Sequence, residues 1–564
     1  MNDGTLGLAG IDYAIVLLYL GGVLLVGTWF ARWVRSPADL FLAGRGLPFW
    51  AIGMSIVVSD IGATDFIAVA GGTYRYGLAQ ANFDWIGSMP ALLVAAFLFV
   101  PFFWRSGVYT VPEFLGRRYN EAVRVSLAMC WGLILVTNLG IMLYATAVLL
   151  RGVMGWDPLV SIWVTAVVVG IYTTSGGLAA VVMTDVLQLV VMFVGGAALA
   201  VRAVWEAGGI GAIREQVLAS GPEYAQHFTL FLPHDTTTPF PWTGILLGLG
   251  IVLSTAYFAG NQAIVQRALG ARSEWDAKAG VVLAGLFKLC IPLLVAVPGL
   301  AALVILPGLA NPDDAVPSLI RTLLPAGLRG LMFAAFIAAL MSSVDSALNS
   351  ASTLWTQDVF VRLHHAATRR ELEPRRVLLV GRTLSVVFLL AAVLIAPEIE
   401  RRFSNVYNAI QSIFSLIQGP SLAILLLGVL WRRATAWGGF AGLASGVTLS
   451  VVLNLDSMAG VFHSSEPYLF IAWWSFVLAL LVTVVVSFAT PPEPPEKIRG
   501  LVVGELRRDP ALQGALARRM RRLTAEDLPP HRGTAGRRSK SEAPLPAPEA
   551  RIAMGGMDEE PASS

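Results

Sequence analysis

Residues 330–358 read GLMFAAFIAALMSSVDSALNSASTLWTQD, an apolar run whose second half is crowded with hydroxyl side chains. The run is long enough to cross a bilayer, which takes about 20 apolar residues. At 100° per residue, one stripe of this helix carries small residues, namely Ala339, Ser342, Ser343, Ser346 and Ser350. Close packing of membrane helices is one explanation of such a stripe. Because hydroxyl and carbonyl oxygens are hard ligands, we expect that the helix supplies ligands for a coupling cation, Na+ in particular.

Acidic side chains inside apolar segments strengthen this expectation. Asp345 lies within the same run, and Asp185 lies several residues inside another one. A carboxylate at membrane depth is costly, so it marks a functional site by default. Asp185 is either a second cation contact or a structural partner for a basic loop.

The composition predicts a polytopic membrane protein. The chain has 564 residues, of which 56% are hydrophobic and 14% are charged, whereas a soluble protein carries about 25% charged residues. Cys130 and Cys290 both lie in apolar segments, so we expect no disulfide framework. No zinc-binding pattern and no nucleophile–base pair is apparent, so the sequence indicates neither an enzyme nor a cofactor beyond a coupling Na+.

Hydropathy indicates an all-α protein with about thirteen transmembrane helices. The spans lie near residues 11–31, 50–73, 83–104, 124–150, 158–174, 178–204, 242–260, 279–306, 327–360, 377–396, 404–430, 436–455 and 468–489. Bases fall in alternate loops, among them Arg118, Arg124, Arg267, Arg272 and Lys278. This bias predicts a plasma or inner membrane protein with the N-terminus outside and the tail in the cytoplasm.

The distribution of polar residues over these spans predicts four parts. Residues 1–49 form an extra helix and the first cytoplasmic loop, and residues 50–431 form a ten-helix transport core. Residues 432–490 add two peripheral helices. Residues 491–564 are a basic tail that we expect to be largely disordered, with a basic helix over 498–523.

The second predicted span is interrupted by polar residues. Its sequence SIVVSDIGATDFIAVAGG, residues 55–72, places Asp60, Gly62 and Asp65 in the middle of an apolar run. Glycine and small polar residues there predict an unwound segment, whose freed backbone carbonyls can bind an ion. Two carboxylates five residues apart on one span favour a functional role over mere packing.

Other spans carry single polar or aromatic residues. Lys288 at membrane depth should pair with a carboxylate or hydrogen-bond a polar substrate. Asp84 opens the third span and is either a site residue or an ordinary interfacial acid. Tyr257 and Phe258 either stack on a substrate, block its exit, or belong to an interfacial aromatic belt. Gln411 and Gln418 are seven residues apart and share a helix face.

At these residues the chain resembles the sodium:solute symporter family. The resemblance covers roughly residues 10–490 and rests on five strings in the family order: DLFLAGRGLPFW (39–50), GVYTVPEFLGRRY (107–119), TSGGLAAVVMTDVLQ (174–188), NQAIVQRALGARS (261–273) and GLRGLMFAAFIAALMSSVDSALNSASTLWTQDVF (327–360). It implies a LeuT-like fold of two inverted five-helix repeats. Spans two to six and seven to eleven would form these repeats, with the extra helices outside.

The resemblance also implies site residues. A sodium site between the second and ninth spans matches the backbone carbonyls of Val58, Ile61 and Ala339 and the hydroxyls of Ser342 and Ser343. A second cation or coupling position matches Asp60, Asp185, Asp345 and Ser346. Substrate contacts match Asp60, Asp65, Asp84, Ser254, Tyr257, Lys288 and Gln411, with Tyr257 as the inner gate. At Asp60, sugar carriers of the family tend to have Asn, and the pattern here resembles proline carriers.

The resemblance therefore implies a sodium-coupled symporter that imports a small polar solute by alternating access, with a sugar or polyol favoured. The alternatives are an amino-acid (proline-like) or monocarboxylate symporter and, in a different class, a membrane sensor or channel on the same fold. An anionic solute would need an uncompensated base. Lys288 is the only base in the predicted site, which contains several acids, and this favours a neutral or cationic solute. The expected partners are this solute, Na+ and the lipid bilayer, with no nucleic acid.

Overall fold

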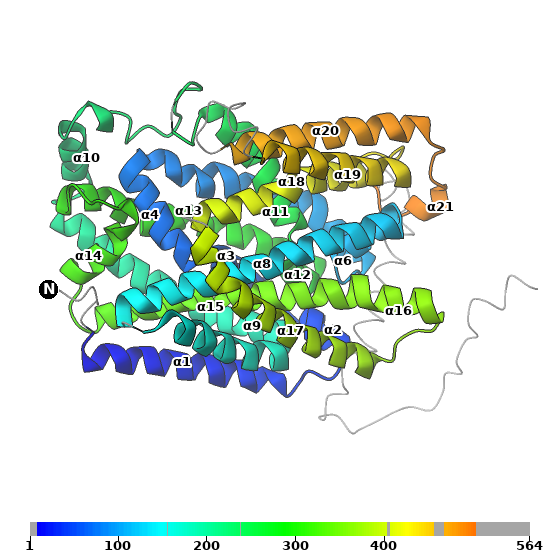
Figure 1. Cartoon of the computed structure of the whole chain (residues 1–564), viewed down its shortest axis with the longest axis horizontal. Coiled ribbons are helices and arrows are strands. Elements are labelled where there is room, and N and C mark those ends of the chain that lie inside the picture. The colour runs from blue at the N-terminus through cyan, green and yellow to red at the C-terminus, as the bar shows by residue number, and fades with distance from the viewer. Residues whose placement is uncertain (1–7, 155, 237, 403–405, 456–466, 504–564) are drawn as a thin grey trace, which may run out of the picture.

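The computed structural model describes residues 8–154, 156–236, 238–402, 406–455 and 467–503, and nearly all of its regular structure is helical. Most helices run along the long axis of the molecule (Figure 1). Among the described residues, ten helices are long and apolar enough to cross a membrane, and two bent helix pairs also qualify. A shorter apolar helix, Pro158–Ile171, corresponds to the fifth predicted span. The prediction of an all-α polytopic membrane protein is confirmed.

The long helices are α1 (Gly10–Ala31), α8 (Glu121–Met154), α9 (Pro158–Glu206), α13 (Glu274–Ile305), α15 (Leu328–Leu354), α17 (Pro374–Arg402), α18 (Val406–Leu430), α19 (Ala436–Leu453) and α20 (Tyr468–Ala489). The third span is a continuous run of η3 (Phe83–Ser88), α5 (Met89–Val94), η4 (Ala95–Phe99) and α6 (Val100–Ser106). Shorter helices are α2 (Pro37–Leu42), η1 (Ala43–Arg45), η2 (Gly77–Ala81), α7 (Val111–Arg118), α10 (Ile210–Ala219), η5 (Pro222–Tyr224), η7 (Pro312–Asp314), α14 (Ala315–Leu323), η8 (Trp355–Phe360), α16 (Val361–Thr368) and α21 (Pro495–Ile498).

Two spans are broken, and each is the first helix of a predicted five-helix repeat. The first break separates α3 (Phe49–Asp60) from α4 (Ala63–Tyr76), and the two halves meet at 66°. The second break, at Asn261, follows η6 (Gly244–Leu253) and α11 (Ser254–Gly260) and precedes α12 (Gln262–Leu269), with a bend of 51°. Interrupted helices in corresponding positions of two halves are typical of transporters whose binding site lies between the repeats.

Helix α15 lies in the middle of the bundle and is buried over almost its whole length. It packs against α9, α8 and α1 (Figure 1), and its polar residues therefore face protein rather than lipid. Helix α9 joins two predicted spans, 158–174 and 178–204, without a loop. Its bend is at Gly177, whose φ of 55° suits glycine, and a Cβ there would meet the Leu40 carbonyl oxygen at 2.4 Å.

Three basic residues that the sequence assigns to loops are buried, so that assignment is wrong for them. Arg118 donates to the carbonyls of Gly428, Trp431 and Ala434, and Arg124 pairs with Asp358 at 2.7 Å. The third, Arg267, lies in α12 because the chain continues as a helix after its bend at Asn261. These guanidinium groups fix helix ends from inside the protein and contribute nothing to a basic surface.

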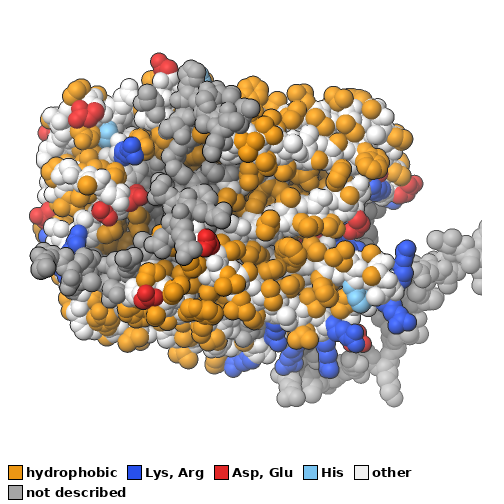
Figure 2. Space-filling view, viewed as in Figure 1, with side chains coloured by type: hydrophobic (Ala, Val, Ile, Leu, Met, Phe, Trp, Pro, Cys, Tyr) orange, Lys and Arg blue, Asp and Glu red, His pale blue; other side chains and the backbone are white. Residues whose placement is uncertain are grey.

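Other bases do gather at one end of the molecule. Arg369 and Arg370 are exposed between α16 and α17, and Arg375 and Arg376 are exposed in the first turn of α17. Figure 2 shows Lys and Arg side chains over this end. Hydrophobic side chains cover much of the face between the two ends (Figure 2). The predicted basic helix over 498–523 and the rest of the tail lie outside the described residues beyond Val503.

Candidate functional site

The break between α3 and α4 frees two backbone carbonyls. In an unbroken helix the N–H groups of Gly62 and Asp65 would bond to the carbonyls of Val58 and Ile61. Here Ile61 is extended, with φ −99° and ψ 101°. Asp65 Oδ2 accepts the N–H of Gly62 at 2.6 Å, and the N–H of Asp65 donates to the Gly62 carbonyl at 3.0 Å. Asp65 thus caps the start of α4 and diverts both donors away from the carbonyls of Val58 and Ile61.

The serines of α15 lie opposite this break. The side chains of Ser342 and Ser343 are buried, and Ser342 Oγ lies 3.4 Å from Ser59 Oγ on α3. Ser343 Oγ donates to the Ala339 carbonyl at 3.1 Å. Ser343 and Ile61 line one cavity in the centre of the bundle. Of the predicted sodium ligands, Ile61 and Ser343 therefore share this cavity, and Ser342 lies beside α3.

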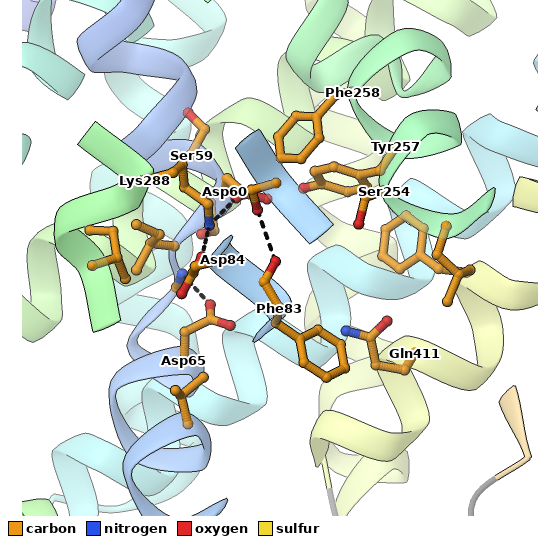
Figure 3. A pocket seen from close by; sticks show the side chains of 18 of the residues that line it. Ser59, Asp60, Asp65, Phe83, Asp84, Ser254, Tyr257, Phe258, Lys288 and Gln411 are labelled. Atoms are coloured by element: carbon orange, nitrogen blue, oxygen red, sulfur yellow. Dashed lines mark hydrogen bonds and ion pairs between the residues drawn. The ribbon is translucent and has the colours of Figure 1, made fainter. Parts of the chain in front are cut away.

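The cavity contains a buried ionic cluster around Lys288. Among the described residues that line it, the charged ones are Asp60, Asp65, Asp84 and Lys288. Lys288 Nζ lies 2.6 Å from Asp60 Oδ2 and 2.5 Å from Asp84 Oδ1. Dashed lines mark both ion pairs in Figure 3. Lys288 thus pairs with carboxylates, as expected for an ammonium group at membrane depth. Asp84 is a buried member of this cluster rather than an interfacial acid.

The opposite wall of the cavity is formed by α11 and α18. Ser254 and Tyr257 come from α11, and Gln411 comes from α18 (Figure 3). The Tyr257 ring packs edge-to-face against Phe258 and Phe414, with centroids 5.3 and 5.9 Å apart. All seven residues predicted to contact substrate therefore line one cavity. An aromatic-belt position for Tyr257 is wrong, because its ring lies inside the bundle.

A second ionic cluster surrounds Asp185 deeper in the protein. Asp185 Oδ2 accepts hydrogen bonds from the hydroxyls of Ser55 and Ser59, the latter at 3.2 Å, and pairs with Arg267 Nη2 at 3.0 Å. Asp185 Oδ1 has no hydrogen-bond partner among the described residues. Both interpretations of Asp185 stay compatible with this arrangement, although its basic partner comes from a buried helix rather than a loop.

Two residues of the predicted second cation position lie beside this cluster. Ser346 Oγ is 2.9 Å from Ser59 Oγ and 3.2 Å from Asp345 Oδ1. Asp345 is fully buried. Asp60, which was assigned to the same position, instead pairs with Lys288 in the cavity.

Arg267 is the central residue that the sequence did not identify. Its Nε donates to Ser55 Oγ at 2.5 Å, and its Nη2 donates to Ser346 Oγ at 2.5 Å and to Ser59 Oγ. It thereby joins α3, α9, α12 and α15 at a single point. The available signal was its place in the apolar string NQAIVQRALG, where a base without a nearby acid needs a partner from another helix.

The segment between α10 and η6 covers the end of α4. The backbone of His227 accepts the N–H of Leu78 at 2.7 Å, and its Nε2 lies 3.3 Å from the carbonyl oxygen of Tyr74. Asn82 Nδ2 donates to the Leu230 carbonyl at 2.6 Å. Burial lowers the pKa of His227 below its ordinary value, because a charged imidazole is poorly solvated there.

Comparison with known proteins agrees with this geometry. A family model described as the sodium:solute symporter family matches residues 40–446. The chain belongs to this family, whose members are transporters and not enzymes, and it is a sodium-coupled symporter with Na+ as the coupling ion.

Several known proteins are similar to this chain in sequence or in fold. The chain is 33% identical to a sodium/glucose cotransporter of Vibrio parahaemolyticus, over 83% of this chain and 89% of the relative. It is 31% identical to the sodium/myo-inositol cotransporter of Homo sapiens, over 86% of this chain and 74% of the relative. A solved Na+-coupled sialic acid symporter shares the fold, with a TM-score of 0.75 at 23% identity over 86% of this chain and 99% of that one. The predicted LeuT-like fold is confirmed.

Proposed function

We propose that the chain imports a sugar or polyol together with Na+ by alternating access. The observation that carries this proposal is the cavity around Lys288, which lies beside the released carbonyls of the α3–α4 break. Carboxylates, an ammonium group, Ser254 and Gln411 offer both donors and acceptors to a hydroxylated solute. The relatives named for glucose and myo-inositol support the same substrate class.

We propose the first Na+ ligands to be the carbonyls of Val58, Ile61 and Ala339 and the hydroxyls of Ser342 and Ser343. An ion there would tie the break to α15, and solute binding in the cavity would then close the outer side. Asp185, Asp345 and Ser346 form a second coupling position, where Arg267 already supplies one positive charge.

The basic end of the molecule supports a proposal for the orientation. We propose that the end with α16 faces the cytoplasm, as the exposed arginines after α16 and in the first turn of α17 favour, and that the N-terminus lies outside. Sodium entry would then be driven by the membrane potential, which contributes about 2.3 kcal/mol per charge per 100 mV. We also propose that residues 50–431 form the transport core and that residues 432–490 form peripheral helices. The segments 1–49 and 491–564 would lie outside that core.

Counterflow with the purified full chain in liposomes tests the proposal. Vesicles are loaded with unlabelled glucose, myo-inositol or proline, and exchange of the labelled solute is measured in Na+ and in choline. We expect saturable exchange of a sugar or polyol that requires Na+. Exchange of proline alone would mean that the substrate is an amino acid and not a sugar or polyol. Exchange that is unchanged in choline would overturn sodium coupling. A flux that does not saturate would indicate a channel.

A further inference from the structure

The cavity holds more acid than base. Lys288 Nζ is bonded to one oxygen each of Asp60 and Asp84, so one ammonium group serves two carboxylates. In the described part of the chain, no cation forms an ion pair with Asp65. A Na+ at the proposed site beside the break would add one positive charge. Three carboxylates against Lys288 and one Na+ still leave one negative charge, and an uncompensated buried charge is costly.

Asp65 is the carboxylate at which this excess lies. Its side chain is at the first turn of α4, next to the N–H of Gly62 and the positive end of the helix dipole. One of its oxygens, Oδ2, is held by Gly62, and the residue also lines the cavity. Figure 3 shows Asp65 below the Asp60–Lys288–Asp84 cluster, on the side away from Tyr257.

The deeper cluster cannot supply the missing charge. Arg267 neutralises Asp185 and is held by acceptors on three of its nitrogen atoms. Its guanidinium group is buried among four helices and therefore cannot follow a solute into the cavity. A cation that enters the cavity itself would supply the compensating charge.

We propose that the transported solute is an amine-bearing sugar or polyol whose ammonium group is received by Asp65. This inference rests on the proposed sugar or polyol symport and narrows its substrate class. The solute's hydroxyls would exchange hydrogen bonds with Lys288, Ser254 and Gln411, while its ammonium group completes the charge balance. The arrangement disfavours anionic solutes, because they would add a further negative charge next to Asp65.

A matched pair of solutes and a matched variant test the inference. D-glucosamine and D-glucose differ at one position, where an ammonium group replaces a hydroxyl, if uptake is measured at about pH 6.5, below the ordinary pKa of an amine. Asp65→Asn keeps a side-chain oxygen to accept the Gly62 N–H and removes only the charge. Full-length wild type and Asp65→Asn are compared by Na+-dependent counterflow in liposomes, and thermal unfolding verifies that the variant is folded.

We expect wild type to prefer glucosamine over glucose by about tenfold or more, and Asp65→Asn to lose that preference. An equal preference in both proteins, or a wild type that exchanges glucose or myo-inositol and ignores glucosamine, overturns the inference and leaves the proposed function intact. Absence of Na+-dependent exchange for every sugar and polyol overturns the proposed function itself. If Asp65→Asn is unfolded, Asp65→Ser replaces it, because serine also caps helices without carrying a charge.

Discussion

Two buried ionic clusters in this molecule have similar ingredients and opposite character. Around Arg267, the guanidinium group is enclosed by Ser55, Ser59, Asp185 and Ser346, all of them buried. Around Lys288, one ammonium group serves two carboxylates at the edge of a cavity that a third carboxylate also lines. The difference shows that the role of a charged residue in a membrane helix depends on the charges of its partners and on whether it borders a cavity. The predictions below test this contrast between the enclosed cluster around Arg267 and the unbalanced one around Lys288.

Removing the base of the enclosed cluster should have the largest effect. Arg267→Leu leaves Asp185 charged and buried without its ion pair, and breaking such a pair costs about 3–5 kcal/mol. We expect a large fall in the thermal unfolding temperature of the detergent-solubilised protein, together with loss of uptake.

The double variant Arg267→Leu/Asp185→Leu separates the two roles of this cluster. We expect it to recover much of the lost stability, because Asp185 no longer leaves a buried charge without its ion pair, and still to be inactive in transport. If Arg267→Leu unfolds at the wild-type temperature, the cluster does not hold the helices together as described.

Removing the base of the unbalanced cluster should mainly affect transport. Lys288→Ala leaves Asp60 and Asp84 without their shared partner, but both border a cavity that water and solute can enter. We expect the solute concentration for half-maximal uptake to rise by about 30-fold, equivalent to about 2 kcal/mol, with a smaller loss of stability than in Arg267→Leu. Uptake measured over a range of solute concentrations decides this. Normal uptake would remove Lys288 from the solute site.

Two serines of α15 test how far the cation-binding part of this helix extends. Ser343→Ala removes a proposed sodium ligand and should raise the Na+ concentration for half-maximal uptake by about tenfold. Ser350→Ala is the matched control on the same stripe, because its hydroxyl donates to Gln266 Oε1 at 3.1 Å instead of facing the break. We expect the control to keep the wild-type Na+ dependence. Equal shifts in both variants would show that the effect is structural.

This pair also shows where prediction from the sequence ends. Hydropathy located the spans because membrane helices must be long and apolar, and the α3–α4 break was predictable from glycine and acids within such a run. Helical periodicity predicts one continuous polar face from Ala339 to Ser350, yet the Ser350 hydroxyl forms a hydrogen bond with α12. Which hydroxyl faces an ion and which faces another helix depends on the neighbour, and helical periodicity carries no information about that neighbour.

The sequence predicts which residues belong to the candidate site, but not which of them form ion pairs with each other. Asp60, Asp84 and Lys288 were each identified by the cost of a charge at membrane depth, and they meet because three spans converge on the cavity. Arg267 was misplaced because the bend at Asn261 resembles the start of a loop. Asn261 accepts the N–H of Ala263 at 2.9 Å, so it ends one helix and caps the next.

The smallest effect is expected at His227, outside both clusters. Its pKa is lowered by burial, so folding favours the neutral imidazole, and the unfolded chain binds the proton more readily. Stability should therefore be complete above the ordinary histidine pKa of about 6.5 and should decline as the pH falls through it. His227→Gln keeps a polar group near the Tyr74 carbonyl and cannot take up a proton in this range.

Thermal unfolding of both proteins at several pH values between about 5 and 8 measures this difference. We expect the wild type to lose slightly more stability than His227→Gln on acidification, while the two proteins agree at the upper end of the range. The effect should not depend on Na+ or solute, because His227 itself bonds to the end of α4, at Tyr74 and Leu78, which belong to neither ionic cluster. Parallel pH profiles would mean that the protonated imidazole is accommodated equally well in the folded and unfolded chain. A difference that disappears in the presence of Na+ would instead connect this covering segment to the break between α3 and α4, since α4 is the element they share.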